Sequence, residues 1–231
     1  MRTNVFPLFY QTVRVLRRLG IITLAGFFLE TPTVTSAAEN APSAPKTILF
    51  FGDSITAGYG LEDPSEAYPG LIEDRIEREH LPYHVVNAGL SGETTAGGLR
   101  RIDWILRQPI SIFVLELGAN DGLRGLAPAQ AEANLQAIID KVRAKEPQVK
   151  ILLEGMMMPT NLGADYTHAF AAIYPALAEK NHLALVPFLL DRVGGVPSLN
   201  QADAIHPNVQ GHAILAETVW KYLEPLLDKN K

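Results

Sequence analysis

A chain of 231 residues, of which 47% are hydrophobic and 19% are charged, has the length and composition of a soluble globular protein with one main domain. Its formal net charge is −5 and it contains no long basic run, which argues against nucleic acid as a partner. The lack of cysteine excludes disulfides, thiolate metal sites and a cysteine nucleophile.

The first 38 residues have the pattern of a secretory signal peptide. Arginines lie within residues 2–18, an apolar run follows at Leu19–Leu29, and small residues lead to Ala38. The apolar run is much shorter than the roughly 20 residues needed to span a bilayer, and an uncleaved membrane anchor is the alternative. We predict cleavage before Glu39, which makes the protein periplasmic or secreted, with no membrane span after cleavage. Residues 39–46 then form a polar linker and 47–231 form the domain.

From Thr47 onward, short apolar runs alternate with longer segments of helical periodicity. The predicted strands are Thr47–Phe51, His84–Asn87, Ile112–Leu117, Lys150–Glu154 and Ala184–Val186. The predicted helices are about Ser65–Glu79, Thr94–Arg107, Pro128–Lys145, Asp165–Lys180 and Pro207–Leu223. Continuously apolar strands that alternate with helices are typical of a parallel sheet covered on both faces. The sequence therefore predicts an α/β protein with a three-layer α/β/α sandwich.

Polar and small residues follow several of these strands, at the edge where an open parallel sheet binds ligands. Ser54 follows the first strand, and Gly92 follows the second, at the expected start of a helix. Asn120 follows the third strand, and the loop after the fifth strand ends at Asp203 and His206. We therefore expect these five residues to lie close together.

Each of these residues suits a role in acyl transfer. A serine hydroxyl is a weak nucleophile unless a base removes its proton, and His206 can serve as the base for Ser54. Asp203 can orient the imidazole and stabilise its charged form. The backbone N–H groups of Ser54 and Gly92 and the side-chain amide of Asn120 can donate to an oxyanion. Together, these five residues predict a serine hydrolase.

Other interpretations of single residues are possible at this stage. Ser54 can be a helix N-cap or a turn residue, and Ser91 is a rival nucleophile, although its segment lacks the Gly-x-Ser-x-Gly pattern and favours a turn. His206 and His212 lie six residues apart, on different faces of a helix, so we expect no metal site and no cofactor. Glu116 lies in an apolar strand, and we expect its carboxylate to accept hydrogen bonds from nearby loop amides.

Four segments resemble the four blocks of the SGNH (GDSL-type) hydrolase family, in the same order. They are Gly52-Asp53-Ser54, Gly92, Gly118–Asp121 and Asp203–His206. The resemblance covers essentially all of residues 47–225. Residues 47–60 and 116–125 are also similar to the bacterial acyl-CoA thioesterase/lysophospholipase/arylesterase group.

The resemblance implies a flavodoxin-like fold with a five-stranded parallel sheet. Carried over by position, it implies that Ser54 is the nucleophile, that Gly92 and Asn120 are oxyanion donors, and that Asp203 and His206 complete the triad. The chain departs from the family pattern where Ile55 replaces leucine, an apolar exchange that leaves the assignment unchanged.

The expected function is hydrolysis of small-molecule acyl esters and thioesters by a monomeric enzyme. Two alternatives are a carbohydrate acetylesterase of the same machinery and a non-catalytic flavodoxin-like binding module. The loops at Met156–Tyr166 and Phe188–Ile205 are mostly apolar, which favours an acyl chain as the bound group. The run Met156–Met158 can belong either to the core or to the pocket wall.

Overall fold

The computed structural model describes residues 44–228, so the predicted signal peptide and most of the predicted linker lie outside the described residues. The strands are β1 (Lys46–Phe51), β2 (Tyr83–Asn87), β3 (Ile112–Leu115), β4 (Lys150–Glu154) and β5 (Ala184–Val186). They pair in the order β2-β1-β3-β4-β5, and all four pairs are parallel. This arrangement confirms the predicted α/β fold with a five-stranded parallel sheet.

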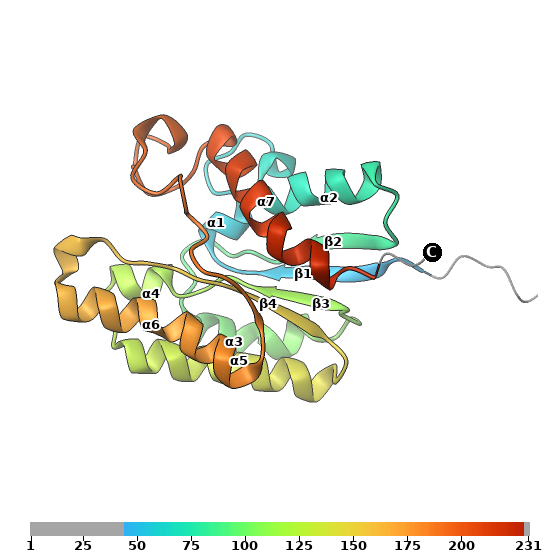
Figure 1. Cartoon of the computed structure of the whole chain (residues 1–231), viewed down its shortest axis with the longest axis horizontal. Coiled ribbons are helices and arrows are strands. Elements are labelled where there is room, and N and C mark those ends of the chain that lie inside the picture. Colours follow the sequence, from blue (N-terminus) through green and yellow to red (C-terminus); the bar gives the residue numbers. More distant parts are fainter. Residues whose placement is uncertain (1–43, 229–231) are drawn as a thin grey trace, which may run out of the picture. The chain divides into compact units, whose positions relative to one another are not determined.

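Helices cover both faces of the sheet (Figure 1). On one face lie α2 (Tyr68–Arg78) and α7 (Val209–Leu223), and on the other lie α3 (Thr95–Ile105), α5 (Pro128–Lys145) and α6 (Ala164–Asn181). Shorter elements are α1 (Ser54–Ala57), α4 (Ala119–Leu123), and the 3₁₀ turns η1 (Pro64–Glu66), η2 (Thr160–Leu162), η3 (Pro197–Leu199) and η4 (Glu224–Leu226). Among residues 44–228, no helix combines the length and the apolar character needed to cross a membrane.

The core sits on both sides of β1 and β3. Ile48–Phe51 and Ile112–Leu115 are almost completely buried, as expected for strands that have helices on both faces. Small residues let one helix approach closely: a Cβ on Gly98 of α3 would lie 2.5 Å from a methyl carbon of Leu117 and 3.1 Å from the ring of Phe51. Helix α3 therefore packs directly over the strand that leads to Ser54.

Two predicted helices begin later than the sequence pattern indicates. The segment expected to form one helix over Ser65–Glu79 divides into η1 and α2, because Pro69 has no N–H to donate to the carbonyl of Ser65. Helix α7 begins at Val209 because Asn208 is its N-cap and accepts from Gly211 N. Neither difference moves a strand end, so the edge that carries the site is unaffected.

Candidate active site

The chain turns sharply between β1 and the short helix α1, and Ser54 is the first residue of that helix. Its N-cap is Asp53, whose carboxylate accepts from Ile55 N at 3.1 Å, so Ser54 is not the cap and its hydroxyl remains available. A Cβ on Gly52 would lie 2.0 Å from the hydroxyl oxygen of Thr56, so the turn requires glycine there.

The structure brings Ser54, His206 and Asp203 together in one hydrogen-bonded chain. His206 Nε2 lies 2.9 Å from Ser54 Oγ, and His206 Nδ1 lies 2.6 Å from Asp203 Oδ2. With its proton on Nδ1, donated to Asp203, the imidazole presents Nε2 as the acceptor for the serine proton. This is the geometry that a general base needs to activate a hydroxyl.

The carboxylate of Asp203 is strongly favoured in its ionised form. The hydrogen bond from the His206 side chain, together with N–H donors from Ile205 and His206 at 3.0 Å, lowers the pKa of Asp203 to about 2. The carboxylate therefore stays charged throughout the pH range in which an imidazole titrates. Tyr59, which the sequence did not single out, packs its ring against His206 with centroids 4.7 Å apart.

Gly92 lies in a tight turn that Glu93 N closes by donating to Leu90 O at 3.1 Å. Its φ of 79° is a conformation that glycine adopts at no steric cost. The prediction that Gly92 starts a helix is wrong, because α3 begins at Thr95 and the turn precedes it. Within residues 44–228, the N–H groups of Gly92 and Ser54 have no hydrogen-bond acceptor, as an oxyanion site requires of its donors.

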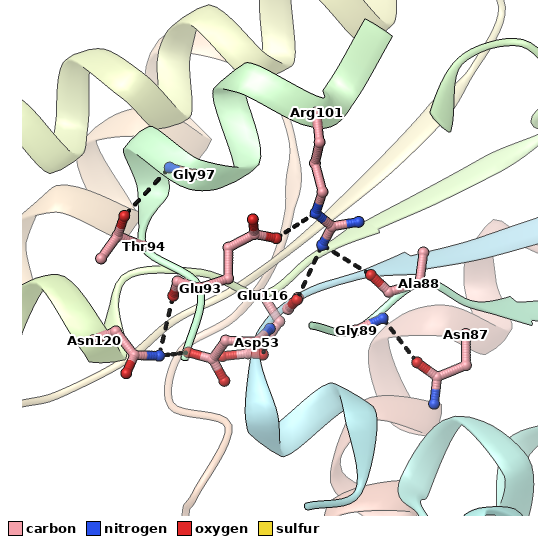
Figure 2. A network of polar contacts seen from close by, with 11 residues as sticks. Asp53, Asn87, Ala88, Gly89, Glu93, Thr94, Gly97, Arg101, Glu116 and Asn120 are labelled. Atoms are coloured by element: carbon pink, nitrogen blue, oxygen red, sulfur yellow. Dashed lines mark hydrogen bonds and ion pairs between the residues drawn. The ribbon is translucent and has the colours of Figure 1, made fainter. Parts of the chain in front are cut away.

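Asn120, near the start of α4, lies next to Asp53 and Glu93, the sequence neighbours of Ser54 and Gly92 (Figure 2). Its Nδ2 donates to Asp53 Oδ2 and to the carbonyl oxygen of Glu93, both at 3.0 Å. Both N–H groups of the Asn120 amide are thus engaged in this structure. To donate to an oxyanion, Asn120 must share or exchange one of these bonds.

A group of buried acidic and hydroxyl side chains lies beneath the turn. Glu116 Oε2 accepts from Asp53 N at 3.0 Å and from the Thr56 hydroxyl at 2.8 Å, so one predicted loop-amide partner of Glu116 is present. Tyr68 contacts the Thr56 hydroxyl and donates to Glu154 Oε2 at 2.8 Å. Burial raises the pKa of Glu116. Burial is also the main cause that raises the pKa of Asp53 well above its ordinary value, and the nearby charge of Glu116 is the second cause.

Within residues 44–228, neither Ser91 nor His212 has a hydrogen bond to Ser54, His206 or Asp203. Ser91 is exposed in the turn, and within the described residues its hydroxyl has no imidazole partner. His212 is buried against Tyr68 and accepts its N–H at 3.2 Å, and burial lowers the pKa of His212 to about 4. Residues 44–228 contain no group of three or more His, Asp or Glu side chains placed to hold a metal ion.

Ile55 and Ile205, the sequence neighbours of Ser54 and His206, line an apolar cavity of about 350 Å³. It begins at Ile55, next to Ser54, and reaches the loops after β4 and β5. The lining residues are Ile55, Ala119, Leu123, Met156–Met158, Pro159, Phe188, Leu190, Gly194, Gly195, Ala204 and Ile205. Met156 and Met158 are buried and Met157 is half exposed, so this run belongs both to the core and to the cavity wall.

Comparisons with known proteins identify the family of the chain. Residues 50–214 match the model of the GDSL-like Lipase/Acylhydrolase family. The chain is 46% identical over 186 residues to "Esterase TesA" of Pseudomonas aeruginosa PAO1, covering 80% of this chain and 91% of the relative. It is 40% identical over 187 residues to "Thioesterase 1/protease 1/lysophospholipase L1" of Escherichia coli K12, covering 80% and 87%. A crystal structure of TesA superimposes with a TM-score of 0.75 at 46% identity, over 79% of this chain and all of that one.

The depressed pKa of Asp203 provides a test of the geometry that does not involve turnover. His206→Phe removes the side-chain hydrogen bond that does most to lower the pKa of Asp203. The carboxyl pKa should therefore rise from about 2 toward its usual value of about 3.9. Carboxyl ¹³C NMR titration of the labelled protein measures this change. The stability that the ionised carboxylate contributes is present above about pH 4 and is lost as the pH falls through about 2.

The matched control is His168→Gln, which changes an exposed histidine of α6 and should leave the titration of Asp203 unaltered. An Asp203 pKa that is the same in His206→Phe as in the unmodified protein contradicts the contact between the two side chains.

Proposed function

Because the chain belongs to the GDSL-like lipase/acylhydrolase family and is an ester hydrolase, we propose that it is a secreted serine esterase acting through Ser54, His206 and Asp203. The observation that carries the proposal is the continuous contact from Ser54 Oγ to His206 Nε2, at 2.9 Å, and from His206 Nδ1 to Asp203, at 2.6 Å. The proposed substrates are aryl esters, lysophospholipids and acyl-CoA thioesters.

The reaction proceeds through an acyl-enzyme. Ser54 Oγ attacks the carbonyl carbon of the substrate while His206 Nε2 takes the hydroxyl proton, and Asp203 stabilises the resulting imidazolium. The oxyanion of the tetrahedral intermediate accepts from the N–H groups of Ser54 and Gly92 and from Asn120. His206 then gives its proton to the leaving alcohol or thiol. A water, deprotonated by His206, attacks the acyl-enzyme, and the acid leaves as Ser54 regains its proton.

The apolar cavity supports an acyl chain as the bound group. Its lining carries methionine, leucine, isoleucine and phenylalanine side chains, and each buried CH₂ of a substrate is worth about 0.8 kcal/mol. A sugar would need aromatic platforms and many hydrogen-bond partners. Neither tryptophan lines the cavity, because Trp220 is buried in α7 and Trp104 is exposed on α3. The carbohydrate acetylesterase therefore remains the less favoured alternative.

Each proposed step is a proton transfer or an acyl transfer between side chains, water and substrate, so the proposal needs no metal and no cofactor. The proposed location is the periplasm or the extracellular medium, and the support for it is the basic, apolar and small-residue order of residues 1–38. We propose that the enzyme acts as a monomer on a small-molecule substrate.

Replacing the nucleophile tests the mechanism. Ser54→Ala should lower kcat for a chromogenic aryl ester by about 10⁶-fold, because the triad acts as a unit, and adding His206→Ala should reduce it little further. Ser91→Ala is the matched control and should retain most of the activity. Near-normal hydrolysis by Ser54→Ala would refute the mechanism.

A series of acyl chain lengths tests the assigned substrate class. With p-nitrophenyl esters, kcat/KM should rise from acetyl to at least hexanoyl, by up to about fourfold for each CH₂ that enters the cavity. The reason is that each added CH₂ leaves water for an apolar wall. A preference for acetyl esters, together with faster cleavage of acetylated sugars than of any fatty acyl ester, would favour the alternative function instead.

A further inference from the structure

We propose that Arg101 is a positioning residue for the oxyanion site: by binding Gly52, Ala88 and Glu93 together, it sets the placement of Ser54, Gly92 and Asn120. This inference rests on the proposed function, because it concerns the same hydrolytic site. Arg101 lies on α3, and its hydrogen bonds within the described residues go to Glu93, Gly52 and Ala88. It therefore acts on the reaction through these partners and not by touching the substrate.

The guanidinium of Arg101 joins the residue after β1 to two residues of the connection between β2 and α3 (Figure 2). Its Nε donates to the Glu93 carboxylate. Its Nη2 donates to the carbonyl oxygen of Ala88 at 2.9 Å and to that of Gly52 at 3.3 Å. The guanidinium also stacks over the ring of Phe51, with its central carbon 4.0 Å from the ring centroid. The ends of β1 and β2 and the turn after β2 are thus held by one side chain.

Glu93 transmits this contact to the oxyanion donors. Its side chain is only 5% exposed, and it packs against the first turn of α3, where a Cβ on Gly97 would lie 2.9 Å from Glu93 Oε1. Its carbonyl oxygen accepts from Asn120 Nδ2 at 3.0 Å, and its preceding residue is Gly92. Glu93, whose carboxylate binds Arg101, therefore holds the two proposed donors that lie outside the nucleophile turn, Gly92 and Asn120.

Gly52 gives the second connection. Its carbonyl oxygen accepts from Arg101 and also from Leu90 N at 2.9 Å, so the nucleophile turn and the turn of Gly92 meet at one oxygen atom. Asp53, the next residue, accepts from Asn120. A displacement of Gly52 relative to Glu93 would therefore change the separation between Ser54 N–H, Gly92 N–H and Asn120.

The chemistry of the contacts requires arginine rather than any cation. A guanidinium presents several N–H donors in a fixed plane, which lets it bind a carboxylate and two carbonyls at once, whereas an ammonium is a compact charge on a flexible stem. Removing the cation entirely would leave a buried carboxylate without its partner, which is strongly destabilising. Arg101→Lys keeps the charge and loses the geometry, so it separates positioning from charge balance.

The test compares Arg101→Lys with Arg100→Lys, which makes the same change at the neighbouring exposed position. We expect Arg101→Lys to lower kcat by about 10- to 100-fold, with KM changed by less than about twofold, because a misplaced donor loses part of the 10²–10³ that a deleted one costs. An alkyl boronic acid, whose tetrahedral adduct on Ser54 mimics the oxyanion, should bind more weakly by a similar factor. Arg100→Lys should match the unmodified enzyme in all three measurements.

Glu93→Gln is the second variant and keeps the proposal testable if Arg101→Lys fails to fold. It removes the charge but keeps the shape, and it should show the same pattern with a smaller loss in kcat. Its control is Asp103→Asn, which removes the α3 carboxylate of an exposed ion pair with Lys141 of α5 and should leave kcat and boronate affinity unchanged.

If Arg101 has a purely structural role, its replacement lowers the melting temperature, but the folded fraction keeps the kcat and the boronate affinity of the unmodified enzyme. That result overturns the proposal. Normal kcat and boronate affinity in both variants overturn it as well. In either case the proposed function stands if Ser54→Ala is inactive. Hydrolysis that persists in Ser54→Ala is the distinct result that refutes the function itself.

Discussion

The position of β1 between β2 and β3 is the constraint on which the active site depends. Parallel pairing sets Phe50 opposite Asn87 and Phe51 opposite Leu115, so three strands end at nearly the same level. The turns that follow them leave the sheet side by side and carry Ser54, Gly92 and Asn120. Because peptide groups in such turns cannot pair within the sheet, their N–H groups remain available to a ligand or to side chains.

The general base reaches this edge from a distant part of the chain, and the side chain of Gln201 helps to hold it there. His206 lies 152 residues after Ser54 in sequence, in the loop between β5 and α7. Gln201 fixes that loop: its Nε2 donates to Tyr59 O at 2.6 Å and to Pro207 O at 3.0 Å, while its backbone N donates to His206 O at 2.8 Å. The histidine loop is thereby tied to the segment that follows the nucleophile helix.

The sequence predicted the sheet and the residues at its edge because both leave short-range signals: apolar runs that end abruptly, and glycine or polar residues directly after them. It did not predict α1 and α4, which are too short for a helical period to show. It identified Asn120 but not its engagement by Asp53 and Glu93. The role inferred for Arg101 has no sequence signal, because two of its partners are backbone carbonyls whose positions only the folded sheet defines. The signal peptide and cleavage site stay predictions.

The most direct test of the central claim is to label the purified protein with a fluorophosphonate and to locate the adduct by peptide mass spectrometry. The contact between Ser54 Oγ and His206 Nε2 predicts a single adduct on Ser54, with loss of ester hydrolysis in proportion to labelling. An adduct on Ser91 or on any other residue, or hydrolysis that continues in fully labelled protein, would contradict the assignment of Ser54 as the activated nucleophile.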